Sequence, residues 1–174
     1  APLNKVLIHE KKLTSNLYLY GYDAELAGQL QLQVMAFNGV DLNVVYAGIE
    51  EAFARFEKEG IAPEDLARIK AGQETEFYQG LSSVLGKGFQ LAQYEIFAGN
   101  AAFISQDVKK ILGVSQDDVM RVYRTYLKDK PYVASSFVPK GNKELVLAGS
   151  TKANVVEELI VEGAEEAFDA SIAA

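Results

Sequence analysis

Residues 15–60 read SNLYLYGYDAELAGQLQLQVMAFNGVDLNVVYAGIEEAFARFEKEG, and this stretch decides the fold. It opens with two runs in which apolar and polar side chains alternate: leucine with tyrosine over residues 17–22, then leucine or valine with glutamine over residues 29–34. Because successive side chains of a β-strand point to opposite faces, each run predicts a strand with one apolar face. The connection over residues 23–28 is short enough to join an antiparallel pair.

The period of the pattern changes at Asp41. From there to Gly60 the apolar residues recur at helical spacing, and they are Leu42, Val45, Ile49, Ala52, Phe53 and Phe56. Asp41 can cap the first turn of this helix, and Gly60 can end the last turn. We expect the helix to cover the apolar face of the hairpin, in a core that includes Leu32, Val34, Ile49, Phe53 and Leu66.

The same alternation leaves a polar face on the other side of the hairpin. Its members are Tyr18, Tyr20, Tyr22, Gln29, Gln31 and Gln33. Tyrosine offers apolar area with a polar tip, and glutamine offers amide donors and acceptors. Such a face suits contact with an extended peptide, but it equally suits packing against a neighbouring domain or exposure to water. The pattern leaves these alternatives open.

The rest of the chain predicts helices, one strand and an acidic tail. Helical patterns cover residues 2–13, 63–80, 89–98, 105–113 and 115–127, with Leu91, Tyr94 and Phe97 facing inward in the third. Ser115 and Asp118 have the spacing of a capping box, and residues 132–138 predict a strand. Helices that follow an antiparallel pair predict an α+β fold with the helices on one face of the sheet.

We interpret residues 1–141 as one domain and residues 142–174 as an acidic connector. The connector has a helical pattern over residues 154–166. The small number of strands also suggests that the first strand of the sheet is missing, upstream of Ala1.

Composition limits the classes of function. The chain has 174 residues, a formal net charge of −7, one histidine and no cysteine. An acidic surface disfavours nucleic acid, and no apolar run is long enough for a membrane span. The absence of cysteine excludes thiol catalysis, and one histidine is too few for the usual zinc sites. Four glutamates cluster on the helix predicted over residues 41–60, and they are Glu50, Glu51, Glu57 and Glu59. They could form a carboxylate metal site, but a solvated helix face is the simpler interpretation. We therefore predict no catalytic residue and no metal ligand.

Four stretches between residues 3 and 141 carry a family likeness. They read LNKVLIHEKKLTSNLYLY, AGQLQLQVMAFNGVDLNVVYAGIEEAFARFEKEGIAPEDLARIKAGQETEF, LAQYEIFAGN and VSQDDVMRVYRTYLKDKPYVASSFVPKG. In order and spacing, the chain resembles the C-terminal-type (second) domain of the M16 zinc metallopeptidases, the group of insulinase, pitrilysin and mitochondrial processing peptidase.

The resemblance implies a fold of the LuxS/MPP-like kind and a place in a clamshell whose halves enclose peptide substrate. Family members hold zinc with an HxxEH motif and a downstream glutamate, and this chain has only His9 followed by Glu10. The other half of an active enzyme supplies an arginine and a tyrosine in a pattern like LRxKxxLxY, where this chain has Ile8 and Ser15.

The resemblance therefore implies a non-catalytic domain of a peptidase whose zinc lies elsewhere. Its partners would be other M16 domains or halves and peptide substrate, and a bacterial periplasm or cell envelope would be its location. The tyrosines and glutamines of the polar face would then line the peptide chamber. The alternative is an M16-like structural or partner-binding domain with no peptidase role.

Overall fold

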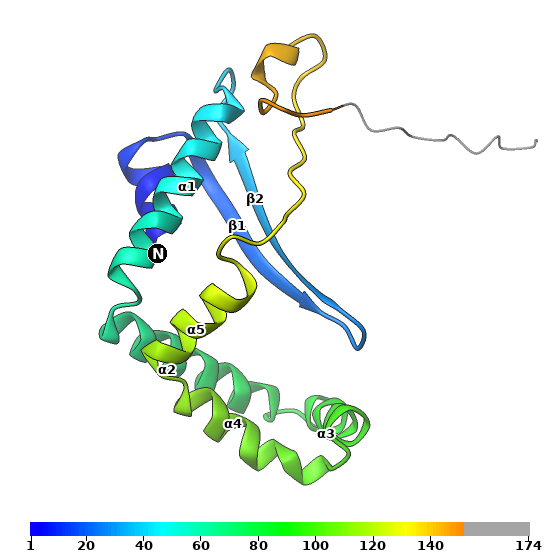
Figure 1. The fold of residues 1–174 in the computed structure, drawn as a ribbon. Coiled ribbons are helices and arrows are strands. Elements are labelled where there is room, and N and C mark those ends of the chain that lie inside the picture. Colours follow the sequence, from blue (N-terminus) through cyan, green and yellow to red (C-terminus); the bar gives the residue numbers. More distant parts are fainter. Residues whose placement is uncertain (152–174) are drawn as a thin grey trace, which may run out of the picture.

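The alternating runs form an antiparallel hairpin, as predicted. The computed structural model describes residues 1–151, and there β1 (Thr14–Asp23) and β2 (Gly28–Ala36) make a two-stranded sheet. The register places Leu17 opposite Val34 and Leu19 opposite Leu32. Within the connection, the Ala24 N–H donates to the Ala27 carbonyl at 3.1 Å. With the helices that follow, the hairpin makes the chain α+β (Figure 1).

Helix α1 (Leu42–Glu59) begins and ends at the residues that the sequence indicates. The Asp41 carboxylate accepts a hydrogen bond from the Asn43 N–H at 2.8 Å. At the other end, Gly60 has a φ of 70°, and its N–H donates to the Phe56 carbonyl at 2.8 Å. A positive φ of this kind is strained for residues with a Cβ, so glycine is required where α1 stops.

The core lies at the base of the hairpin, between the sheet, α1 and the N-terminal helix η1 (Asn4–Glu10). This first helix has a π-type hydrogen-bond pattern and is shorter than the predicted one. Its residues fill the centre of the core with one residue of α1, and the buried cluster consists of Leu3, Val6, Leu7 and Ala52. Half-buried residues of both strands and of α1 pack around it, and they are Leu13, Leu17, Leu32, Val34 and Ile49.

The expected five-residue core is therefore only partly correct. Leu32, Val34 and Ile49 surround the cluster, as predicted. Phe53 instead stacks on Tyr123 of α5, with ring centroids 6.3 Å apart. Leu66 is buried, but it lies outside the cluster. The reason is that the chain turns sharply after α1, so the next three helices lie beyond the end of α1 that is remote from this core (Figure 1).

Those helices form a separate layer that α5 connects back to α1. Their bounds are α2 (Pro63–Gly80), α3 (Val84–Ala98), η2 (Ala101–Phe103), α4 (Ile104–Gly113) and α5 (Gln116–Tyr126). The capping box that starts α5 is confirmed, with the Ser115 hydroxyl accepting from the Asp118 N–H at 3.1 Å. Leu91 and Phe97 of α3 are 42% and 71% exposed, so their predicted inward orientation is wrong, because few elements lie near α3 to cover them.

The strand predicted over residues 132–138 does not form. The only strand pairing in the described part of the chain is that of β1 with β2. Residues 132–138 instead form no regular structure, and at their start the Tyr132 and Tyr46 hydroxyls are 2.6 Å apart. The short helix η3 (Lys143–Leu145) follows. The helical pattern at 154–166 lies outside the described residues.

Candidate functional site

The strand register brings the predicted polar residues together on one face. Each tyrosine of β1 stands directly opposite a glutamine of β2, and the pairs are Tyr18 with Gln33, Tyr20 with Gln31, and Tyr22 with Gln29. Side chains of residues directly opposite in an antiparallel pair share a face, so the six form three successive cross-strand rungs. All six are exposed. We call these six residues the tyrosine–glutamine face.

Two of the three tyrosine hydroxyls are bonded to the sheet itself. The Tyr20 hydroxyl donates to Oε1 of Gln31, directly across the ladder. The Tyr18 hydroxyl accepts a hydrogen bond of 3.3 Å from Nδ2 of Asn16. These bonds turn the polar tips toward the protein, while the tyrosines remain 52% and 44% exposed at positions 18 and 20.

The face carries no charged side chain. By the alternation of the strands, Asn16 and Met35 extend it toward the base of the hairpin, and both are uncharged and exposed. The nearest acidic residues, Asp23 and Glu25, lie at and beyond the end of β1. A surface of phenol rings and amides offers apolar contact and hydrogen bonds, and it has no group suited to general acid or base catalysis at neutral pH.

The opposite, leucine-bearing face is covered only near the base of the hairpin. Leu17 and Leu32 pack on the core, whereas Leu19 and Leu30 are each 47% exposed. At the turn, Leu26 is 96% exposed. The outer half of the hairpin projects beyond α1 (Figure 1) and its leucines are exposed, so the expectation that the helices bury the leucine face is wrong there.

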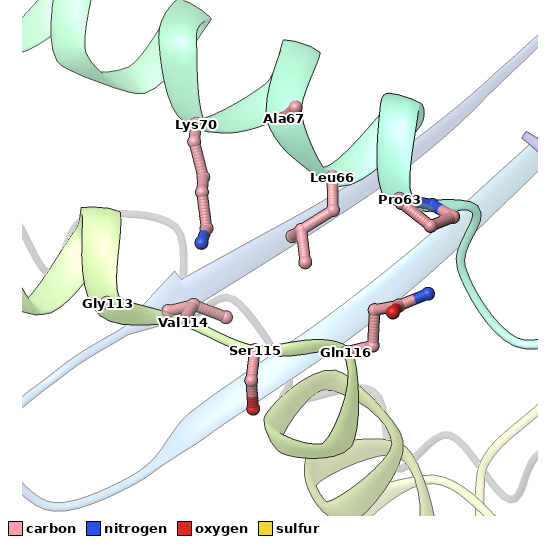
Figure 2. Close-up of a pocket in the computed structure, with 8 residues that line it drawn as sticks. All are labelled: Pro63, Leu66, Ala67, Lys70, Gly113, Val114, Ser115 and Gln116. Carbon is pink, nitrogen blue, oxygen red and sulfur yellow. The ribbon is translucent and has the colours of Figure 1, made fainter.

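Apart from the tyrosine–glutamine face, the structure has a pocket of about 420 Å³ where α2 meets the turn between α4 and α5. Figure 2 shows Leu66 pointing into it, with Lys70 reaching from α2 toward Val114. Two of its polar side chains already serve the fold. Nε2 of Gln116 donates to the Ile61 carbonyl at 2.6 Å, and the Ser115 hydroxyl belongs to the capping box. Sequence reasoning identified Leu66 as a core residue but gave no signal for this pocket.

Three of the four glutamates of α1 make ion pairs or hydrogen bonds, and Glu50 accepts from the Tyr46 hydroxyl at 2.8 Å. Glu51 bonds Lys11 at 2.9 Å and also Arg55, while Glu57 bonds Lys128. Lys11 and then Arg55 lower the pKa of Glu51 below its usual range. Within residues 1–151, no three histidine, cysteine or acidic side chains are grouped so as to hold a metal ion. These contacts favour the interpretation of the glutamates as a solvated, ion-paired helix face.

The remaining observations concern membranes and known proteins. In the part of the chain that the structure describes, no helix has the length and apolar composition needed to cross a bilayer. No protein-family model matches the chain, and no curated protein matches it significantly. The tyrosine–glutamine face is thus defined by its geometry and chemistry alone.

Proposed function

We propose that this chain is a non-catalytic domain of an M16-type zinc metallopeptidase, and that its tyrosine–glutamine face forms part of the wall of the peptide chamber. The zinc and the residues that hold it would lie elsewhere in the parent enzyme. There the zinc would activate water for peptide hydrolysis, while this chain would contact and orient the peptide.

Two features support the proposed family. The four stretches that resemble M16 sequences occur in the family's order over residues 3–141. The hairpin leading directly into α1 agrees with the first two of these stretches, whereas the strand expected in the fourth stretch does not form. Because the chain has one histidine and no HxxEH motif, we expect the isolated chain to cleave no peptide and to bind zinc weakly.

The observation that carries the proposed role is the register of the hairpin. It gathers three tyrosines and three glutamines on one exposed, uncharged face. Tyrosine contributes apolar area and glutamine contributes amide hydrogen bonds, and neither demands one particular peptide sequence. A wall of this composition suits a chamber that accepts varied peptides.

The test is a triple variant, Tyr18→Ala, Tyr20→Ala and Gln31→Ala, in the full-length parent enzyme. A chamber wall predicts a higher KM with kcat largely unchanged, because the variant loses substrate contacts and leaves the zinc chemistry intact. Tyr78→Ala is the matched control, since Tyr78 is 56% exposed on α2, away from the face. If the triple variant keeps the KM of the parent enzyme, substrate does not contact this face and the proposed role is wrong.

The alternative is a structural or partner-binding domain, and a specific observation favours it. Large apolar side chains are exposed on the outer hairpin and on α3, and they are Leu19, Leu26, Leu30, Val84, Leu85, Phe89, Ile96 and Phe97. Exposed apolar patches of this kind mark protein interfaces. In the same parent enzyme, Leu19→Ser with Leu30→Ser should separate its halves in sedimentation velocity if docking is the main role, whereas the triple variant should not.

A further inference from the structure

We propose that the tyrosine–glutamine face selects extended peptides with apolar side chains at every second position, and that it reads them with tyrosine rings and not with hydroxyls. This inference rests on the peptide-contact function proposed above. It adds the conformation and the side-chain pattern of the peptide.

The spacing of the rungs selects the conformation. Residues two apart in a strand are about 7 Å apart, so the three tyrosines span about 14 Å. An extended peptide lying along β1 repeats its same-side residues at this interval and can place one side chain on each rung. Two turns of an α-helix cover about 11 Å, which is about 3 Å too short. Two turns of polyproline helix cover about 19 Å, which is about 5 Å too long.

The hydrogen bonds within the face decide what the tyrosines can offer. The Tyr20 hydroxyl is committed to Gln31, and the Tyr18 hydroxyl accepts from Asn16. The Tyr20 hydroxyl can donate to a ligand only by giving up Gln31, with little net gain, whereas the Tyr18 O–H and the Tyr22 hydroxyl donate to no group in the described residues. The rings themselves remain about half exposed and have no aromatic partner among the described residues. Ring contact is the attraction that all three tyrosines can add without giving up an existing bond.

The absence of charge decides which side chains face the rungs. A charged peptide side chain turned toward the face would lose hydration and find no opposite charge there. An apolar side chain would gain contact area with the rings. Since alternate residues of an extended peptide point away, into water, the intervening positions are unconstrained. The expected pattern is thus apolar at every second residue and free in between.

The experiment compares two short capped peptides of identical composition by isothermal titration calorimetry with the 174-residue chain. In one, Phe, Leu and Phe alternate with serine, and in the other the three apolar residues are consecutive. We expect the alternating peptide to bind about tenfold more tightly. Equal affinities would overturn the selection by spacing and leave the chamber-wall function standing. Binding of neither peptide would overturn both.

Variants of the chain test the role of the rings. Tyr18→Phe with Tyr20→Phe keeps both rings and removes both hydroxyls, so it should bind the alternating peptide within about threefold of the parent chain. Tyr18→Ser with Tyr20→Ser should weaken binding about tenfold. Tyr78→Ser is the control away from the face, and circular dichroism checks the fold of each variant. If the phenylalanine variant binds as weakly as the serine variant, the hydroxyls read the peptide and the proposal is wrong. If the serine variant fails to fold, the phenylalanine variant still tests the role of the hydroxyls, and the peptide pair still tests the selection by spacing.

Discussion

Gly48 of α1 lies directly against Leu7 of η1. A Cβ added at Gly48 would be 2.7 Å from Cδ2 of Leu7, a side chain with no exposed area. The two helices therefore approach as closely as they do because position 48 has no side chain.

This contact predicts the effect of Gly48→Ala on stability. Alanine should gain up to about 1 kcal/mol in helix propensity, but overpacking in a filled core costs about 1–3 kcal/mol. We expect a net loss of roughly 1 kcal/mol in the free energy of unfolding, measured by urea denaturation. Gly72→Ala in α2 is the matched control, because no atom lies within 4 Å of the added Cβ. The control should be neutral or stabilising. If Gly48→Ala is stabilising as well, the contact between Gly48 and Leu7 leaves room for a methyl group and this prediction is wrong.

Adjacent residues of β2 should differ sharply in their contribution to stability. Leu32 packs on the core, whereas Gln31 lies on the exposed face. Leu32→Ala should lower the free energy of unfolding by about 2 kcal/mol, at the low end for core truncations because Leu32 is only half-buried. Gln31→Ala should change it by less than about 0.5 kcal/mol. Equal losses in a denaturant titration would contradict the assignment of the two faces.

Tyr123 should hold α5 against α1. Its ring is 6% exposed, stacks on Phe53 and meets Phe56 edge-on at 5.2 Å. Tyr123→Ala should cost about 3–5 kcal/mol, comparable to other buried aromatic truncations. Tyr126→Ala, at a 69% exposed position of the same helix, should stay within about 0.5 kcal/mol. Thermal unfolding of both variants, followed by circular dichroism, tests the difference, and similar midpoints would argue against this role for Tyr123.

The start of α5 should weaken in acid. Hydrogen bonds from the Ser115 hydroxyl and amide, and from Arg121, lower the pKa of Asp118 to about 2 from 3.8. Because the folded-state pKa is the lower one, the stabilisation is complete above about pH 4 and is lost as the pH falls toward 2. Carboxyl NMR should show Asp118 titrating near pH 2. Asp118→Asn should remove this part of the acid sensitivity, and a titration midpoint near 3.8 would contradict the capping box.

The sequence predicted features that neighbouring residues determine. Alternation identified the hairpin and grouped the six polar residues on one face, and the caps at Asp41, Gly60 and Ser115 are local hydrogen-bond or backbone requirements. The cross-strand pairing of Tyr20 with Gln31 was not predictable, since register depends on the turn as well as the pattern.

Features that depend on distant packing could not be predicted. Residues 132–138 have strand-forming side chains, but strand propensity depends on context, and this segment pairs with neither edge of the hairpin. Likewise, the apolar spacing of α3 predicted an inward face for Phe97, and no local signal shows that few elements pack around this helix.

The outer hairpin, open on both faces, has a consequence for dynamics. A two-stranded ribbon without a covering layer is only marginally stable in water, so its rungs should fray from the turn inward while the base stays closed. Amide hydrogen exchange would then be fastest near Leu26 and slowest near Thr14, which is 1% exposed. The peptide proposed for this face would bind only the closed ribbon, so fraying would lower its apparent affinity in proportion to the closed fraction.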